Sequence, residues 1–297
     1  MPIKKNKKNF ITAFSLIEIS VIMLIISVMI AGLLQGGDLV YRMRLNSARA
    51  ITEKSPVPNI ENLQAWFEPT MPNVFTSSGA LVEFVDTDLV IEKWQNLNPQ
   101  IISSLKSHAT QTTSSNQPTV KIDKYNTGLP MVRFDTNKFM NLNNGTVPYG
   151  NSPYTIFIVS KLDSFCTCGI IGSGTYGTDK NTNAFRYSTE GKYINYWWGT
   201  ALGYDFISGT VVKTQKLQLA TFEYDNVNRY FYLNGVFSSQ FASSNNLSTA
   251  LNNTIGVTNS TEYLIGSIAE IIIYSTDLRD NDRKIVENYL IEKWGIK

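Results

Sequence analysis

The hydrophobic pattern divides the chain into two parts with different periods. Residues 14–34 form an apolar run that Glu18 interrupts near its start, and 21 helical residues at 1.5 Å each are enough to cross a bilayer. From residue 63 onward, short aromatic and β-branched runs alternate with clusters of Asn, Gly, Ser and Asp, which predicts strands and turns. The clearest predicted strands are 154–160, 217–224, 229–235 and 268–275.

The second part has the pattern of one antiparallel β-sandwich. Strand-like runs recur over about 230 residues without the long helices that βαβ units need. Residues 225–228 separate two such runs and predict a hairpin. One helix closes the chain, with apolar residues on one face and Gly295 placed as its C-cap. Those apolar residues are Ile285, Val286, Tyr289, Leu290 and Trp294.

Prolines and glycines refine the boundaries of these parts. Pro56 and Pro58 end the N-terminal helix and open a linker. Gly36 and Gly37 together lower helix stability by about 2 kcal/mol, so we expect a bend or a melted turn there. The predicted divisions are a leader at 1–13, a helix at 14–52 that is transmembrane over 14–34, a linker at 53–61 and a β-sandwich at 62–297.

Charge is unevenly distributed along the chain. Four lysines lie within the first eight residues, which places the start of the chain in the cytoplasm and predicts that the rest is exported. Without residues 1–13, the chain has 22 basic and 24 acidic residues. This balance gives no reason to expect nucleic acid as a partner.

The N-terminal residues resemble a known family. The stretch KKNKKNFITA-FSLIEISVIMLIISVMIAGLL is similar to the leader and first helix of type IV pilins and type II secretion pseudopilins. The resemblance implies that a prepilin peptidase cuts between Ala13 and Phe14 and methylates the new amine of Phe14. It also implies that Glu18 pairs with the Phe14 amine of a neighbouring subunit during filament assembly, because each charge alone is costly in lipid. The family usually has Gly where this chain has Ala13.

Residues 63–297 carry a second resemblance. The segments TGLPMVRFD, YTIFIVSKLDS, FEYDNVNRYFYLNGV, IGSIAEIIIYSTDL and VENYLIEKWGI follow one another as in the concanavalin A-like lectin/glucanase superfamily, and are most similar to laminin-G-like jelly-roll domains. The chain has Arg279 where the family often has a Ser or Thr helix cap. The resemblance implies a domain that binds a glycan or a surface protein, in some members with calcium. Three carboxylates available for calcium are Asp123, Asp135 and Asp179.

An aromatic stretch is the candidate ligand site. Sugar recognition favours exposed aromatic rings, and YINYWWGTALGYDF is rich in them. In a strand, Tyr196 and Trp198 share one face while Trp197 takes the other, so part of the set belongs to the core. The candidate ligand-binding residues are Tyr196, Trp197, Trp198 and Tyr204.

No catalytic constellation is evident in the sequence. The acidic stretch 83–88 lacks the carboxylate spacing of glycan hydrolases and is interpreted as a loop. His108 is the only histidine, which disfavours a triad or a metal cluster. Residues 172–177 are interpreted as a turn, not a phosphate loop. Cys166 and Cys168 are interpreted first as two unpaired thiols, with a local disulfide as the alternative.

Together these patterns predict a minor pilin with a lectin-like head that acts in surface adhesion and is not an enzyme. The predicted partners are the peptidase, other pilin subunits, the inner membrane and a glycan or surface protein. A minor pseudopilin of a type II secretion system shares every feature of residues 1–50 and remains open. A membrane-anchored glycan hydrolase would need a carboxylate pair, which the sequence does not show. A DNA-uptake subunit would need a stripe of basic residues on the head, and none is evident.

Overall fold

The computed structural model describes residues 15–124, 126–198, 203–243 and 245–297. The chain divides into two compact units, residues 1–44 and 45–297, and each is described here by itself. The predicted leader and the predicted processing residues, Ala13 and Phe14, lie outside the described residues.

The N-terminal helix α1 spans Leu16–Glu53, close to the predicted 14–52. It is helical without interruption at Gly36 and Gly37, so the melted turn that we expected does not form. Ser15 and Glu18 form a capping box at its start: the Ser15 amide donates to Glu18 Oε2 over 2.8 Å, and the Ile17 amide donates to Ser15 Oγ over 3.3 Å. In the described part of the chain, no helix combines the length and the hydropathy of a membrane span.

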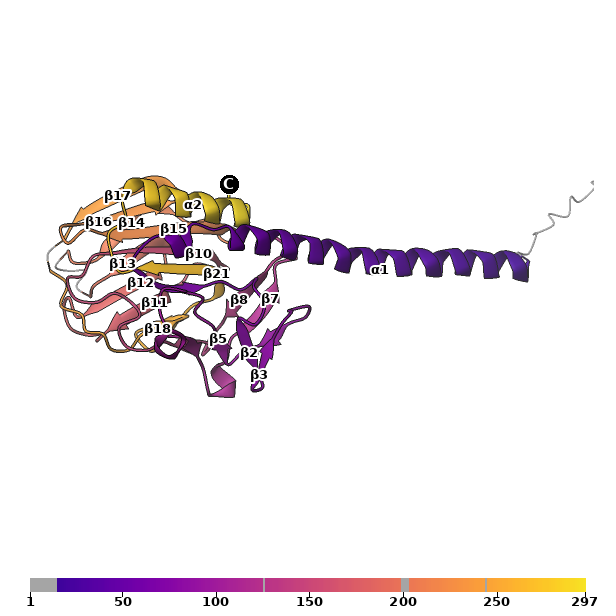
Figure 1. The fold of residues 1–297 in the computed structure, drawn as a ribbon, viewed down its shortest axis with the longest axis horizontal. Coiled ribbons are helices and arrows are strands. Elements are labelled where there is room, and N and C mark those ends of the chain that lie inside the picture. The colour runs from indigo at the N-terminus through magenta and orange to yellow at the C-terminus, as the bar shows by residue number, and fades with distance from the viewer. Residues whose placement is uncertain (1–14, 125, 199–202, 244) are drawn as a thin grey trace, which may run out of the picture. The chain divides into compact units, whose positions relative to one another are not determined.

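The predicted antiparallel sandwich is confirmed within the second unit, by two sheets whose strands lie between residues 63 and 274 (Figure 1). The first sheet runs in the order β17 (Val236–Ala242), β16 (Asn228–Leu233), β15 (Leu217–Tyr224), β10 (Tyr154–Leu162), β21 (Gly266–Tyr274), β8 (Pro130–Phe134), β7 (Thr119–Ile122) and β4 (Leu89–Val90), and β1 (Leu63–Phe67) also pairs with β21.

The second sheet lies against the first and contributes the other half of the sandwich. Its strands run in the order β14 (Phe206–Val211), β13 (Lys192–Tyr196), β12 (Thr182–Tyr187), β11 (Cys168–Gly174), β18 (Thr254–Ile255), β9 (Met140–Asn141), β6 (Ala109–Thr110), β5 (Lys93–Trp94), β2 (Phe75–Ser77) and β3 (Ala80–Val82). A small hairpin pairs β19 (Val257–Thr258) with β20 (Glu262–Tyr263). Single 3₁₀ turns are η1 (Val57–Asn59), η2 (Ser103–Leu105) and η3 (Ser114–Asn116).

The core fills the space between the two sheets. Alternate residues of each strand point into it, as period-2 patterning requires, so Phe185 and Tyr193 of the second sheet meet Phe222 of the first. The long strands β10 and β21 are buried along nearly their whole length, because one face meets this core and the other is covered.

Helix α2 (Asp280–Trp294) covers the outer face of the first sheet (Figure 1). Gly295 takes a left-handed conformation at φ 60° and caps the helix, as predicted. Arg279 stands at the N-cap without a side-chain cap; instead its guanidinium pairs with Asp282 in the first turn. The helix is therefore held through its buried face more than through its N-terminal cap.

Candidate functional site

The outer face of the second sheet is the candidate site. It is accessible over β13 and β14, where alternate residues are half-buried or exposed, whereas β11 and β12 are buried along their whole length and the β19–β20 hairpin packs over β11. The register places Arg186 opposite Ile194, and Ala184 opposite Tyr196. Side chains alternate along each strand, so these residues point away from the core while Tyr187, Tyr193 and Asn195 point into it. The strand alternation predicted from the sequence therefore holds in β13.

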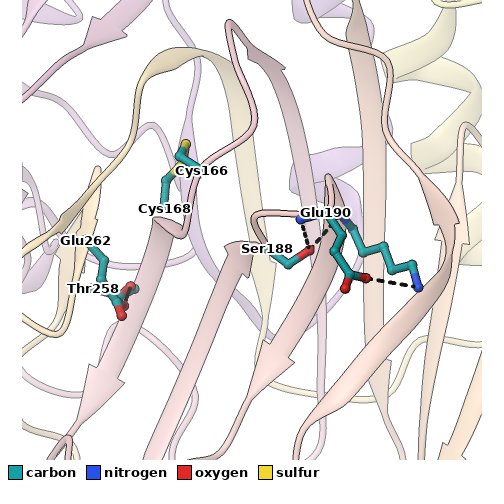
Figure 2. Close-up of a disulfide and its surroundings, with 7 residues drawn as sticks. Cys166, Cys168, Ser188, Glu190, Thr258 and Glu262 are labelled. Atoms are coloured by element: carbon teal, nitrogen blue, oxygen red, sulfur yellow. Dashed lines mark hydrogen bonds and ion pairs between the residues drawn. A yellow bond between two sulfur atoms is a disulfide. The ribbon is translucent and has the colours of Figure 1, made fainter.

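An ion pair joins β12 to the β19–β20 hairpin on this face. Arg186 Nη1 lies 2.9 Å from Glu262 Oε2, and Thr258 Oγ1 donates to the same glutamate over 2.9 Å. Thr258 and Glu262 both belong to the β19–β20 hairpin, which packs over β11. The packing needs glycine in β11, since a Cβ at Gly169 would clash with the backbone of Thr258. Figure 2 shows Thr258 and Glu262 beside this strand.

Aromatic rings gather next to the ion pair. The Arg186 guanidinium lies 4.6 Å from the Tyr196 ring centre, and Trp198 meets the Tyr196 ring edge-on at 5.4 Å. Tyr176 in turn contacts Trp198 at 6.1 Å. These three rings are half-buried, so each keeps part of its surface for a ligand. We name Tyr176, Arg186, Tyr196, Trp198 and Glu262 the outer-face site.

The phenol groups of this site stay protonated at neutral pH. Burial, and after it the Asp205 carboxylate, raises the pKa of the Tyr196 phenol above its usual value. Burial likewise raises the pKa of Tyr176. A neutral phenol both donates and accepts hydrogen bonds, so the Tyr196 hydroxyl suits a ligand that carries hydroxyl groups, whereas the Tyr176 hydroxyl oxygen is buried.

Tyr204 lies at the margin of the outer-face site. Lys180 joins the two: its backbone amide donates to the Trp198 carbonyl over 3.1 Å, and its ammonium lies 4.3 Å from the Tyr204 ring centre. Tyr204 is also half-buried. The structure thus brings together three of the four candidate aromatic residues of the sequence analysis.

Trp197 is the exception and requires a correction. Its side chain is only 1% exposed, with Nε1 donating to Asn183 Oδ1 over 3.2 Å and the Arg229 guanidinium 3.9 Å from its ring centre. A ring enclosed in this way cannot stack on a sugar, so Trp197 is a core residue. Arg229, itself 1% exposed, was not identified from the sequence, because nothing in RYFYL distinguishes a buried arginine from a surface one.

A pair of glutamates, also missed from the sequence, lies beneath α2. Lys293 Nζ donates to Glu68 Oε1 and, over 2.9 Å, to Glu270 Oε2, and all three side chains are fully buried. The other carboxylate positions are occupied by further donors, which are Trp66 Nε1, Trp294 Nε1 and Tyr289 hydroxyl on Glu270, and Thr70 amide, Thr70 hydroxyl and Met71 amide on Glu68. A closed, saturated pair offers no room for a sugar, and we interpret it as a structural lock.

The acidic stretch 83–88 lies between β3 and β4, as a loop, which confirms the prediction. Asp88 makes an exposed ion pair with Lys121 at 3.0 Å. His108 accepts a hydrogen bond from the Asn96 amide at Nδ1, and burial, followed by Lys93, lowers the pKa of its imidazole. Both features are accounted for by local structure.

The carboxylates considered for calcium are engaged elsewhere or exposed. Asp123 pairs with Lys161 at 3.1 Å, Asp135 pairs with Arg133 at 3.3 Å, and Asp179 is exposed. Among the described residues, no group of three or more His, Cys, Asp or Glu side chains is arranged to hold a metal ion.

Cys166 and Cys168 form a disulfide, so the prediction of two unpaired thiols was wrong (Figure 2). The objection to a bridge between these positions was that both would lie in an extended strand. Only Cys168 lies in β11; Cys166 belongs to the preceding turn, which brings the two Cα atoms to 5.3 Å.

Solved structures share this fold at low sequence identity. The binding domain of Paraclostridial Mosquitocidal Protein 1 aligns with a TM-score of 0.53 and 11% identity, over 79% of this chain and 55% of that one. Trypanosoma rangeli sialidase in complex with sialic acid aligns with a TM-score of 0.50 and 12% identity, over 78% of this chain and 33% of that one. The chain therefore spans about half the length of the first and a third of the second.

No curated protein matches the chain in sequence. A family model does: residues 134–282, which include β10 to β21 and all five residues of the outer-face site, match the model described as the concanavalin A-like lectin/glucanases superfamily. These strands carry the sandwich core as well as the open face. The chain belongs to the concanavalin A-like lectin/glucanases superfamily.

Proposed function

We propose that the β-sandwich binds a glycan through the outer-face site, and that the chain is a minor, pilin-like subunit which presents this domain at the cell surface for adhesion. The observation that carries the proposal is the half-buried Tyr196–Trp198 pair beside the Arg186–Glu262 ion pair, on a sheet face that α2 does not cover.

The chemistry of these groups suits a sugar. A pyranose ring has an apolar C–H face that packs on an aromatic ring, and hydroxyl groups around its edge. Tyr196 and Trp198 supply such rings. Glu262, whose side chain is 18% exposed, supplies a charged acceptor, and the buried Arg186 guanidinium holds it in place beside the rings. Hydrogen bonds to charged groups are roughly twice as strong as neutral ones, so the pair can select among hydroxyl patterns.

The N-terminal helix supports the membrane and filament part of the proposal. Large apolar side chains on α1 between Leu16 and Ile30 are exposed within their own unit, including Leu16 at 86% and Ile17 at 72%. An apolar surface of this extent is stable when lipid or neighbouring helices cover it. Inner-membrane insertion before assembly, followed by packing into a pilus, provides both kinds of cover.

Glu18 has a local partner as well as the proposed one. Its carboxylate accepts the Ser15 amide, one residue from Phe14. Cleavage after Ala13 would therefore create an ammonium group close to a carboxylate that caps a helix, and the neighbouring subunit's amine can compete for it. Mass spectrometry of the chain coexpressed with a prepilin peptidase should show loss of residues 1–13 and a methylated Phe14; an uncut chain would contradict the pilin assignment.

The disulfide supports export. Disulfides persist in oxidising compartments such as the periplasm and the cell surface, and are rare in the cytosol. The Cys166–Cys168 bridge precedes β11 of the second sheet, so it belongs to the part of the chain that we propose is outside.

A glycan-array screen of residues 45–297 tests the binding function. We expect saturable binding to one glycan class, weakened about 5- to 10-fold by Tyr196→Ala and by Trp198→Ala, since one aromatic contact contributes about 1 kcal/mol. Tyr149→Ala is the matched control, because Tyr149 is 44% exposed and lies outside the outer-face site. Absence of binding across the array, or an equal loss in the Tyr149 variant, would contradict the proposal.

A further inference from the structure

A second cavity lies at one end of the sandwich, apart from the outer-face site. It has a volume of about 630 Å³, within the size range of small-molecule pockets. It is bounded by the turn before β8, the connection from β14 to β15, and the C-terminal end of α2. Its lining residues are Asn126, Thr127, Leu129, Lys213, Lys216, Leu217, Gln218, Asn234, Glu292, Lys293, Trp294, Gly295, Ile296 and Lys297.

Three of the lysines in this lining have no carboxylate partner. Lys213, Lys216 and Lys297 are exposed and form no ion pair within 4.0 Å among the described residues. Lys293 differs from them, because the buried glutamates Glu68 and Glu270 neutralise it. Glu292 is the acidic residue of the lining, so the cavity carries a net positive charge.

The polar amides of the lining are fixed by the backbone. Gln218 is 6% exposed, and its Oε1 accepts the Lys213 amide over 2.7 Å. Asn234 Oδ1 accepts the Leu219 amide over 2.9 Å. Both side-chain oxygens therefore accept a backbone hydrogen bond, and the amino group of Gln218 is the part of these two amides that can donate to a ligand.

We propose that this cavity binds an acidic sugar residue of a polysaccharide, with its carboxylate or sulfate group held by Lys213 and Lys216. The Gln218 amino group and the Thr127 hydroxyl would serve the sugar hydroxyls. The volume is far larger than a bare anion needs. Nucleic acid fits poorly, since the lining offers no exposed ring on which a base could stack: its one aromatic residue, Trp294, is 1% exposed.

The probe is trigalacturonic acid, titrated calorimetrically into the full-length chain in a sugar-free zwitterionic detergent, with its neutral methyl ester as the matched ligand. We expect one saturable site for the acid and none for the ester, with affinity that falls as salt rises. The Lys213→Gln/Lys216→Gln double variant should bind about 10-fold more weakly, because each partly exposed charge pair contributes up to about 1 kcal/mol. The control variant Lys284→Gln, which changes a lysine of α2 outside the cavity, should bind the acid with unchanged affinity.

Several outcomes would overturn the proposal. These are no binding of either the uronate or a sulfated trisaccharide, equal binding of acid and ester, an unchanged affinity in a folded double-lysine variant, or binding of inorganic sulfate as tight as that of the trisaccharide. Binding of a sulfated trisaccharide in place of the uronate would support the site and assign sulfate as its anion. Trp198→Ala should leave this binding intact, so failure here and failure of the outer-face site are separable.

Discussion

The two outer faces of the sandwich each carry a glutamate paired with a cation, and the pairs have opposite surroundings. On the first sheet, Glu270 and Lys293 are fully buried under α2 with donors on every carboxylate oxygen. On the second sheet, the side chains of Arg186 and Glu262 are 6% and 18% exposed and lie beside half-buried rings, on a face that α2 does not cover. A glutamate–cation pair is thus fully enclosed beneath α2, whereas the pair on the other sheet leaves part of the Glu262 side chain accessible to solvent.

The largest expected effect comes from breaking the covered pair. Lys293→Met leaves Glu68 and Glu270 buried without their cation, which should lower the free energy of unfolding by about 3–5 kcal/mol. Chemical denaturation measures the change, and Lys284→Met, whose side chain is 58% exposed, should be near neutral. A loss below about 1 kcal/mol would show that the covered pair does not lock α2.

A second effect on the covered side depends on pH. Burial, and after it the neighbouring Asp277 carboxylate, raises the pKa of Glu223 to about 8. Between about pH 4.5 and 8 the folded state then holds a proton that the unfolded state has lost, so stability is greatest at the acidic end and falls as pH rises to about 8. We expect Tm to fall by about 5 °C from pH 5 to pH 9, a change of roughly 2 kcal/mol.

Glu223→Gln should flatten this pH profile, because glutamine cannot ionise. Glu190→Gln is the control, since Glu190 is exposed and pairs with Lys192 at 3.5 Å. A profile that rises with pH in the unmodified chain would contradict the assignment.

The smallest expected effect on stability comes from breaking the Arg186–Glu262 pair. Glu262→Gln keeps the shape of the side chain but removes its charge, and should cost about 1–2 kcal/mol of unfolding free energy, because the Arg186 side chain is 6% exposed and loses its charged partner. The same variant should weaken glycan binding about 5-fold if the pair contacts the ligand. Chemical denaturation and array binding, measured on one preparation, check the expected stability and the expected affinity. A large loss of stability with unchanged binding would show that this pair is structural too.

The fold followed from the sequence where its physical cause was local. The strand at 217–224 was predicted with its observed bounds, and the hairpin turn at 225–228 followed from its residue types, because Asn226 adopts a positive φ of 77° there. Strands of two or three residues between 75 and 141 were not predicted individually, since their pairing depends on partners far along the chain.

The candidate site could be predicted from the sequence only in part, because several of its contacts join residues that are far apart in the chain. Alternation separated Trp198 from Trp197, but it could not say which of the two faces was the core. The Arg186–Glu262 pair joins residues that are far apart in sequence, and so does the pair of Glu68 and Lys293. Cys166 was misjudged because a strand boundary between it and Cys168 decides whether they can meet.

The lock between Glu68, Glu270 and Lys293 has a consequence for biogenesis. It joins Glu68, directly after β1, to β21 and α2. β1 therefore cannot pair until β21 has been synthesised, and Glu68 cannot meet its cation until residue 293 has been synthesised. Contacts of such long sequence separation form slowly. The nascent domain should therefore leave the ribosome unfinished, which is the condition that a translocation channel for unfolded chains requires.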